Sequence, residues 1–264
     1  MLYQENIWIY FMKLMVVKMI SLITVCYNSQ STIEETIKSV LNQNYDNYEY
    51  IIKDGLSSDK TLEIVKKYEK KFKGKLKIIS SKDKGIYDAM NIAIKSAKGD
   101  IIGLLNADDI LASKDAFKII NDSFKDKVDG VYSNLYIKDY ETMSKTIRKF
   151  IPKTGNYKLG WYPPHPTLYL KKEVYEKYGY FDINYKIASD YDFMLRLMKN
   201  KVNLKYVNKE LVYMRSNGVS TNGLSGYKKS FDESIRVLKN NNIKFPYIVN
   251  IIRTFKVLLQ SLIK

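Results

Sequence analysis

The chain has 264 residues, of which 45% are hydrophobic and 27% charged, a composition that fits a globular protein and excludes an intrinsically disordered one. Its 44 Lys and Arg against 28 Asp and Glu give a formal net charge of +16, which favours anionic partners such as nucleotides, lipid phosphates or nucleic acid. The single cysteine, Cys26, excludes an internal disulfide and fits a reducing compartment, and the single histidine, His165, excludes a histidine-based metal cluster.

Residues 1–19 form an apolar extension that Glu5, Lys13 and Lys18 interrupt. No uncharged run in it reaches the roughly 18 residues that a membrane-spanning helix needs. The acidic residue ahead of the apolar part, without a small-residue cleavage pattern after it, argues against a signal peptide. Two interpretations stay open: an interfacial helix, or an extension ahead of the internal Met19.

Strands and helices alternate three times in the next part of the chain. Each predicted strand is a short apolar run, and each predicted helix has apolar residues at helical spacing. Ser31 or Thr32 is expected to cap the first helix, and Gly99 to end the third. This alternation predicts a parallel, doubly wound sheet. The predicted strands are 20–25, 48–53, 76–79 and 101–105, and the predicted helices are 33–41, 60–72 and 86–97.

The first strand-to-helix turn has neither of the two common nucleotide-binding signatures. Its sequence, Tyr27-Asn28-Ser29-Gln30-Ser31, contains no Gly-x-Gly-x-x-Gly and no Walker loop. The first half is therefore an α/β unit of nucleotide-binding size that belongs to neither design.

The pattern changes after residue 112. Three prolines exclude a helix from Trp161 to Pro166. Residues 225–264 are helical in pattern and carry eight Lys and Arg against two Asp and Glu. Between these features we predict a helix at 113–124, a strand at 130–137 that pairs with 142–151, helices at 173–178 and 189–200, and a strand at 204–214.

Two carboxylates follow directly on a buried strand. The apolar run Ile101–Leu105 leads to Asp108 and Asp109, so both side chains are expected at the carboxyl edge of the sheet, where open α/β folds bind ligands. Hard oxygen donors there suit a Mg²⁺ or Mn²⁺ ion that also takes phosphate oxygens. The alternative is an acidic loop that caps the next helix.

Five segments in one order resemble the family 2 glycosyltransferases of the GT-A fold, and among them the bacterial enzymes that assemble surface polysaccharides of the colanic acid and O-antigen type. The segments are Thr24-Val25-Cys26-Tyr27-Asn28-Ser29, Lys53-Asp54-Gly55-Leu56-Ser57-Ser58-Asp59-Lys60-Thr61, Asp83-Lys84-Gly85-Ile86-Tyr87-Asp88-Ala89-Met90-Asn91, Leu105-Asn106-Ala107-Asp108-Asp109 and Ala188-Ser189-Asp190-Tyr191-Asp192.

This resemblance implies an α/β GT-A fold: a doubly wound, mostly parallel sheet with helices on both faces, a small mixed sheet on the acceptor side, and C-terminal helices. It divides the chain into the extension, a GT-A domain at 20–222 and basic amphipathic helices at 223–264. Within the domain, residues 20–112 would bind the nucleotide-sugar, and residues 113–222 would bind the acceptor and carry the catalytic base.

The resemblance also implies roles on the donor side. Asp109 would hold the metal ion, and Asp108 would contact the sugar or ribose and share the metal, with Asn106 standing where the family often has aspartate. Asp54 would accept a nucleobase N–H, although an Asx-type turn is the alternative. Asp83 and Lys84 would contact the sugar or diphosphate, although Lys84 also reads as a solvated lysine. The remaining donor-side residues are Thr24, Tyr27, Asn28 and Arg215, the last holding diphosphate unless it is a surface arginine.

On the acceptor side, Asp190 is the candidate catalytic base, because an inverting transfer needs a group that removes the acceptor hydroxyl proton. Its alternative is an N-cap aspartate, and Asp192 carries the same ambiguity. Trp161 and His165 would shape the acceptor pocket. Ile86, Ala89 and Met90 are expected in the core.

The resulting hypothesis is an inverting, metal-dependent transfer of a sugar from a UDP- or GDP-sugar to a glycan or polyprenyl-diphosphate-linked acceptor, in the cytoplasm or at the inner face of the plasma membrane. The alternatives are a sugar nucleotidyltransferase and a basic nucleic-acid-binding protein, although no nucleic acid partner is expected. The stretch Tyr247–Leu262, with Arg253 and Lys256, is amphipathic and basic. It either lies on an anionic inner leaflet or packs on the domain.

Overall fold

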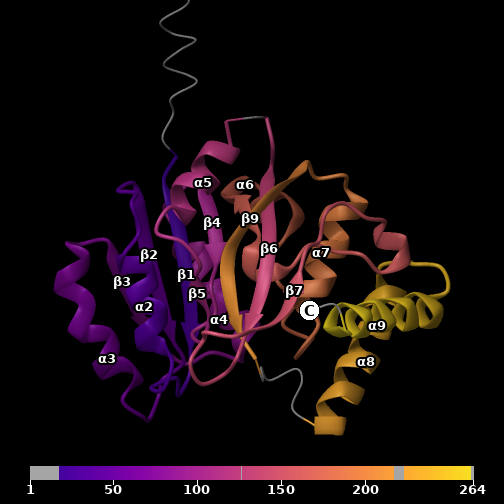
Figure 1. Cartoon of the computed structure of the whole chain (residues 1–264), viewed down its shortest axis with the longest axis horizontal. Helices are drawn as coiled ribbons and strands as arrows, with labels where there is room; N and C mark the ends of the chain where they lie inside the picture. The colour runs from indigo at the N-terminus through magenta and orange to yellow at the C-terminus, as the bar shows by residue number, and fades with distance from the viewer. Residues whose placement is uncertain (1–17, 126, 217–222, 263–264) are drawn as a thin grey trace, which may run out of the picture.

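One sheet runs through the whole molecule (Figure 1). The computed structural model describes residues 18–125, 127–216 and 223–262, so residues 1–17 of the predicted extension lie outside it. The strands are β1 (Ile20–Cys26), β2 (Tyr48–Asp54), β3 (Leu76–Ser80), β4 (Ile101–Leu104), β5 (Ile110–Leu111), β6 (Gly130–Lys138), β7 (Thr146–Phe150), β8 (Tyr169–Lys171) and β9 (Leu204–Arg215). The helices are α2 (Ile33–Leu41), α3 (Thr61–Tyr68), α4 (Ile86–Ser96), α5 (Ala116–Ser123), α6 (Lys172–Tyr178), α7 (Ser189–Lys199), α8 (Gly223–Asn240) and α9 (Pro246–Leu262).

The first half is the predicted doubly wound unit. Strands β3, β2, β1 and β4 lie side by side in this order and are all parallel. Successive residues of β1 point to opposite faces of the sheet: Ile20 and Leu22 join one core cluster, and Ile23 and Val25 join the other. Helices α2, α3 and α5 cover the first face, and α4, α6 and α7 cover the second.

The second half extends the same sheet. Strand β8 is antiparallel to both β4 and β6, whereas β6 and β9 are parallel and β5 closes the edge antiparallel to β9. The predicted pairing of the segments at 130–137 and 142–151 is confirmed as the β6–β7 hairpin. The strands expected as a small mixed sheet thus continue the parallel one. The sequence did not predict β8 and β5, since three and two residues are too few to show a period.

Three local predictions need correction. Thr32 occupies the N-cap of α2, but its side chain makes no capping hydrogen bond. Helix α4 ends at an extended Ala97, and Gly99 is required instead by close packing, because a Cβ there would come within 2.6 Å of Ser21 Oγ. A single 3₁₀ turn forms at His165–Thr167 within the proline-rich loop, because a proline in the first turn needs no N–H.

The C-terminal helices pack on the second half of the domain (Figure 1). A third core cluster joins Tyr191 and Leu195 of α7 to Val237 and Leu238 of α8 and to Val249 of α9. The predicted helical character of the last forty residues is therefore confirmed. These helices also share a core with α7, which carries the candidate base.

Candidate active site

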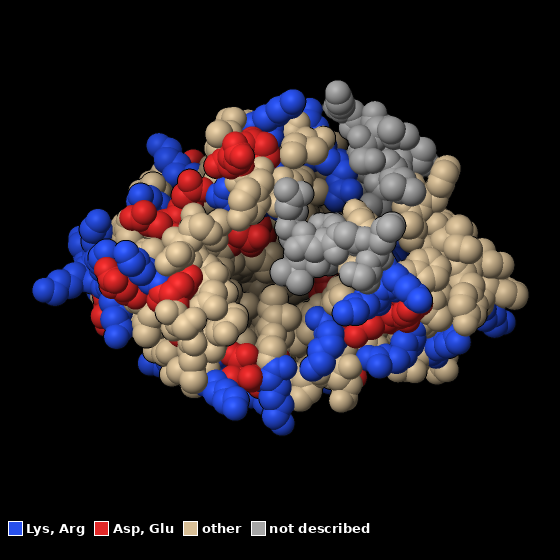
Figure 2. Space-filling model, turned by 90° about the horizontal axis from the view of Figure 1, so that it is seen from below, with Lys and Arg blue, Asp and Glu red and all other residues tan. Residues whose placement is uncertain are grey.

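The parallel strands β1, β2 and β4 end at the same edge of the sheet, which is the lower edge in Figure 1. Figure 2 looks onto this end of the molecule and shows a hollow in its middle, with acidic side chains near its rim and Lys and Arg farther out. Three of the five segments of the family resemblance directly follow these strands, so the sheet brings them together as predicted.

Asp108 and Asp109 have different surroundings in the turn after β4. Asp109 is fully buried, and its carboxylate accepts hydrogen bonds from Asn106 Nδ2 at 2.8 Å and from the Arg215 N–H at 3.1 Å. Asp108 is only half-buried. Burial raises the pKa of both carboxyl groups, and the charge of Asp108 raises the pKa of Asp109 further. The carboxylate open to a ligand is therefore that of Asp108.

Asn106 explains why this turn tolerates two adjacent acids. Its amide donates to Asp109 Oδ2, whereas an aspartate at this position would place a third negative charge there. The departure from the family pattern thus serves the internal hydrogen bonding of the turn.

The guanidinium group of Arg215 braces the same turn. It donates to the Asp108 carbonyl oxygen at 3.2 Å and also to Glu35 and the Tyr140 carbonyl oxygen. The side chain is 4% exposed. In this arrangement Arg215 is no surface arginine, and its predicted contact with diphosphate stays a prediction.

Asp54 closes a turn at the end of β2. Its buried carboxylate accepts hydrogen bonds from Leu56 N at 3.1 Å, Ser57 N at 3.2 Å, Ser80 Oγ at 2.9 Å and the Ser57 hydroxyl. These are the contacts of the Asx-type alternative, and a nucleobase would have to share them. Leu56 has φ +65 and is 53% exposed, a strained backbone at the rim of the site.

Lys53 is a site residue that the sequence did not reveal. It is completely buried, and its ammonium group donates to the Asp54 and Ser81 carbonyl oxygens at 2.8 and 2.7 Å and to Asp83 Oδ2 at 2.7 Å. Asp83 also accepts the Gly85 N–H. Lys53 therefore ties the end of β2 to the loop that carries Asp83 and Lys84. Its only sequence signal is a charged residue inside an apolar strand.

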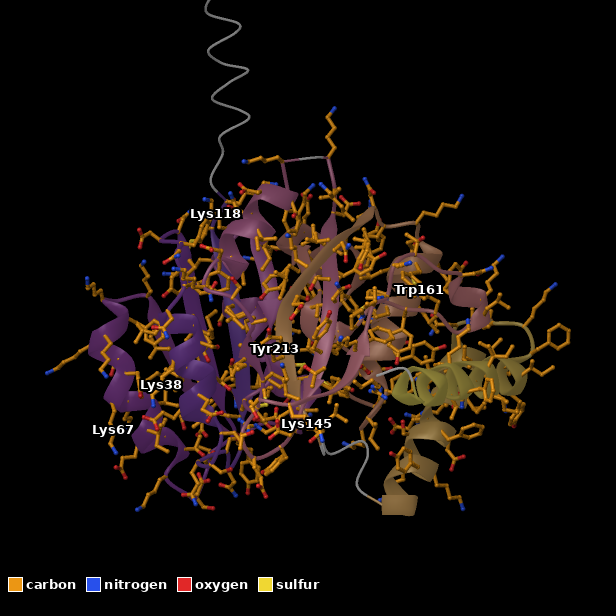
Figure 3. All side chains as sticks on the ribbon, in the orientation of Figure 1. Lys38, Lys67, Lys118, Lys145, Trp161 and Tyr213 are labelled. Carbon is orange, nitrogen blue, oxygen red and sulfur yellow. The ribbon has the colours of Figure 1, made fainter. Side chains whose placement is uncertain are left out.

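Replacing Lys53 by methionine is expected to destabilise the protein by about 3 kcal/mol or more, since breaking a buried ion pair leaves polar groups unsatisfied. Urea denaturation measures this loss. The control is Lys67→Met on the outer side of α3 (Figure 3), where the ion pair with Glu63 is exposed and worth about 0.5 kcal/mol. Equal losses in both variants would contradict the structural role of Lys53.

Helix α4 connects the donor side to the candidate base. The Tyr87 hydroxyl donates to the Ile187 carbonyl oxygen at 2.5 Å and to Asp190 Oδ1 at 3.3 Å. One turn later, Asn91 exchanges two hydrogen bonds with the backbone of Phe181. Two side chains of one helical face thus hold the segment before α7. Neither had a predicted role.

Asp190 is half-buried and is the second residue of α7. Ala188, not Asp190, is the N-cap, so the N-cap alternative is wrong for this residue. Tyr87, which contacts Asp190, lines a small pocket together with Lys84 and Lys186. Lys84 is exposed, as a ligand contact or a solvated lysine requires.

Ile86 lines the same pocket and is 49% exposed, so its prediction as a core residue is wrong, whereas Ala89 and Met90 are buried as expected.

Two other predicted site residues, Thr24 and Asp192, form hydrogen bonds with neighbouring side chains. Thr24 is fully buried and accepts the Tyr50 hydroxyl. Asp192 binds Arg196 and Asn241. By contrast, Tyr27 is 64% exposed beside Gly55, and the exposed Asn28 accepts the Ser58 N–H at 2.9 Å.

Trp161 packs on Gly155 and Tyr132 and donates to the Pro152 carbonyl oxygen. Figure 3 shows Trp161 well above Lys145, which marks the lower end of the sheet. Its contacts hold the proline-rich loop in place, and its role in acceptor binding stays a prediction.

His165 packs against Phe181 with the two rings tilted, and its Nε2 is buried without a hydrogen-bond partner among the described residues. Burial lowers the pKa of His165 below its ordinary value of 6.5, and the charge of Asp190 partly opposes this shift. The predicted association of His165 with the acceptor side is compatible with this position.

The lowered pKa of His165 predicts a loss of stability in acid. The unfolded chain binds the proton more readily, so stability present above pH 6.5 is lost as the pH falls below it. Between pH 7.5 and 5.5 the wild type should lose up to about 1.4 kcal/mol more than His165→Gln. Melting temperatures of both proteins at the two pH values check this, and parallel pH curves would contradict it.

The side chains present could bind a divalent cation only if a second molecule supplied further oxygen ligands. Among the described residues, no group of three or more His, Cys, Asp or Glu side chains could hold a metal ion. Asp108 and its neighbour offer hard oxygen donors of the kind that Mg²⁺ accepts together with substrate phosphates. Burial is the main cause of the raised pKa of both carboxyl groups, and the charge of Arg215 partly opposes it. The donor set therefore suits a cation that arrives with a diphosphate.

Comparisons with known proteins show the family of this chain. The model of the family described as "Glycosyl transferase family 2" matches residues 21–207. The Escherichia coli UDP-Glc:alpha-D-GlcNAc-diphosphoundecaprenol beta-1,3-glucosyltransferase WfaP is 37% identical over 127 residues, which are 47% of this chain and 49% of WfaP. An uncharacterised glycosyltransferase of Methanocaldococcus jannaschii is 27% identical over 93% of this chain and 87% of its own length.

Solved structures show the same fold. Staphylococcus aureus TarS 1–349 in complex with UDP has a TM-score of 0.65 and 20% identity, with 85% of this chain and 65% of that chain covered. The Pyrobaculum calidifontis mannosyltransferase PcManGT, in complex with GDP-Man and Mn²⁺, has a TM-score of 0.65 and 15% identity, with 94% and 76% covered. The match to WfaP thus spans about half of that protein, whereas the GT-A fold is shared over most of this chain.

Proposed function

Because the chain belongs to glycosyl transferase family 2, we propose that it transfers a sugar, with inversion, from a UDP- or GDP-sugar to a glycan or lipid-linked saccharide in cell-surface polysaccharide biosynthesis. The observation that carries this proposal is the contact of Tyr87 with Asp190. Tyr87 belongs to the helix that follows Asp83 and Lys84, so one side chain joins the donor loop to a carboxylate suited to act as a base.

On the donor side, Asp108 would hold a Mn²⁺ or Mg²⁺ ion, and Arg215 and Asn106 keep its turn in place. When bound, the cation neutralises charge on the departing nucleoside diphosphate. Asp54, Asp83 and the exposed Tyr27 would receive the nucleoside and sugar.

On the acceptor side, Asp190 would accept the proton of the attacking hydroxyl group. The acceptor oxygen then bonds to the anomeric carbon as the bond from that carbon to the diphosphate oxygen breaks. The diphosphate leaves with the electron pair of this bond, and the proton stays on Asp190. A single displacement of this kind inverts the anomeric configuration and needs no second carboxylate as nucleophile.

Two relatives support the choice of donors and acceptor. WfaP is named for a UDP-linked sugar donor and a diphosphoundecaprenol-linked acceptor, and PcManGT was solved with GDP-Man and Mn²⁺. Their names motivate a nucleotide-sugar donor, a lipid-linked acceptor and a divalent cation for this chain.

A thermal-shift screen of nucleoside diphosphates and their sugars, with and without Mn²⁺, tests the proposal. A ligand that binds only the native state raises the melting temperature according to its concentration relative to Kd, so the cognate nucleotide should stand out and should need the cation. Release of nucleoside diphosphate from that donor is the expected activity. Release of pyrophosphate would indicate the nucleotidyltransferase alternative, and no response across the panel would contradict both.

One side of helix α9 packs on the domain, and its other side leaves apolar residues exposed. Val249 and Asn250 are buried against the domain, whereas Ile248, Ile251 and Phe255 are 56%, 58% and 60% exposed. In the described part of the chain, no helix is both long and apolar enough to span a bilayer. We propose that this exposed apolar face rests on an anionic membrane surface, because the adjacent lysines are exposed and cationic and would meet its charge. These lysines are Lys244 and Lys256.

The variant Ile251→Ser/Phe255→Ser is expected to bind vesicles of phosphatidylglycerol and phosphatidylcholine at least about tenfold more weakly, since burying each side chain is worth about 1.5–3 kcal/mol. Co-sedimentation measures the binding. The control Ile147→Ser removes a side chain of β7 that is 46% exposed and should bind as the wild type does. Equal binding of all three proteins would rule out this face.

A further inference from the structure

We propose that Glu233, on α8, is a positioning residue for Asp190. Its carboxylate accepts three consecutive backbone N–H groups: Lys186 N at 2.9 Å, Ile187 N at 2.8 Å and Ala188 N at 3.0 Å. These amides lead directly into α7, in which Asp190 is the second residue. The inference rests on the proposed role of Asp190 as the base.

The start of α7 is held by a side chain from another helix. Its N-cap is Ala188, whose side chain has no oxygen, and no capping side-chain hydrogen bond from this residue is present among the described residues. Helix N-termini favour a negative charge nearby, and the first turn of α7 carries Asp190 and Asp192 of its own. Glu233, 45 residues farther along the chain than Ala188, adds a carboxylate that accepts the N–H groups of the N-cap residue and of the two residues before it.

The segment that leads to Asp190 is held from two sides. Tyr87 of α4 donates to the Ile187 carbonyl oxygen and to Asp190 itself, while Glu233 accepts the N–H groups on the other side of the same peptide units. With both contacts, the segment has little freedom to turn. Without Glu233, the N–H groups of residues 186–188 would lose their acceptor. Asp190 would then keep only its hydrogen bonds from Tyr87 and from the Tyr191 N–H among those described.

Glu233 is one of two acidic residues in the basic C-terminal region of the chain. Residues 225–264 carry eight cations and only two acids, Asp232 and Glu233. Asp232 is exposed, whereas Glu233 is partly buried against α7. The family match ends at residue 207, so this contact belongs to the C-terminal helices, whose core with α7 holds α8 in place.

The test compares Glu233→Gln with the matched control Asp232→Asn, since each removes one negative charge from α8. Glu233→Gln is expected to lower kcat about tenfold, because a shift of about 1 Å in a reacting group can cost up to a hundredfold. The KM for the donor and the Kd for its nucleoside diphosphate should stay unchanged. Glu233→Asp, which keeps the charge on a shorter side chain, should recover part of the kcat. Asp232→Asn should behave as the wild type does.

Hydrogen exchange separates this inference from the proposed function. The amides of residues 186–188 should exchange at least about tenfold faster in Glu233→Gln than in the wild type or Asp232→Asn. Faster exchange together with the kcat loss supports the inference. Faster exchange in a protein without transferase activity would overturn the proposed function but leave the structural contact standing. Unchanged exchange, unchanged kcat, or an equal loss in Asp232→Asn would overturn the positioning role.

Discussion

Asp108→Asn is expected to lower kcat/KM for sugar transfer about 10³-fold. Asp108 is half-buried and is the more accessible carboxylate of its turn, whereas the oxygens of Asp109 accept hydrogen bonds from Asn106 and Arg215. Cation stabilisation of a leaving diphosphate is worth several kcal/mol, and about 4 kcal/mol corresponds to 10³ in rate. Steady-state release of nucleoside diphosphate measures the loss. Mn²⁺ should also cease to raise nucleotide affinity.

Two further variants sharpen this prediction. Asp122→Asn, on α5, removes an exposed carboxylate that pairs with Lys125 and should leave the activity unchanged. Asp109→Asn tests the division of roles, since the family resemblance assigns the metal first to Asp109. If Asp109→Asn abolishes the Mn²⁺ response while Asp108→Asn keeps it, then Asp109 turns outward when the donor binds.

Asp190→Asn is expected to lower kcat by about 10²–10⁴-fold, the usual contribution of a general base. The amide retains the size of the side chain and an oxygen to accept the Tyr87 hydroxyl and the Tyr191 N–H. The fold and the donor site should therefore be preserved. Single-turnover transfer to the acceptor measures the chemical step, and calorimetry measures nucleotide binding, which should change by less than about twofold.

The control for this variant is Asp182→Asn. Within the described residues, the carboxylate that it removes accepts its hydrogen bonds from the neighbouring Asn184. This control should retain nearly full activity. If Asp190→Asn kept its kcat, another group would have to take the acceptor proton, and His165, whose Nε2 lacks a partner, would be the next residue to replace.

Local sequence patterns predicted most of the strands and helices, because the spacing of apolar residues that marks such an element lies within the element itself. The alternation of Ile20, Leu22, Ile23 and Val25 between two faces specifies a strand buried on both sides. The patterns failed for β8, whose position between β4 and β6 depends on partners far away in the chain. Three residues carry no period, and only tertiary contacts select them as a strand.

Some residues of the candidate site could likewise be predicted from local sequence, whereas others depend on contacts far away in the chain. Asp108 and Asp109 could be predicted because a strand followed by acids has a known destination at the sheet edge. Lys53 and Tyr87 could not, because their partners lie 30 and about 100 residues away. Arg215 was predicted to hold diphosphate, which stays a prediction, and its contacts with Glu35 and the Asp108 carbonyl oxygen could not be predicted because they require the assembled tertiary structure.

The contacts of Arg215 with the Asp108–Asp109 turn affect the order in which parts of the chain can fold during synthesis. All four strands of the parallel half have been synthesised by residue 104, so this half can collapse early from local contacts. Asp109, however, accepts the N–H of Arg215, and β5 pairs only with β9. A ribosome-bound chain that stops before residue 215 therefore contains the four parallel strands without the backbone N–H that binds the Asp109 carboxylate. We expect such a chain to fold in part before it can retain a nucleotide.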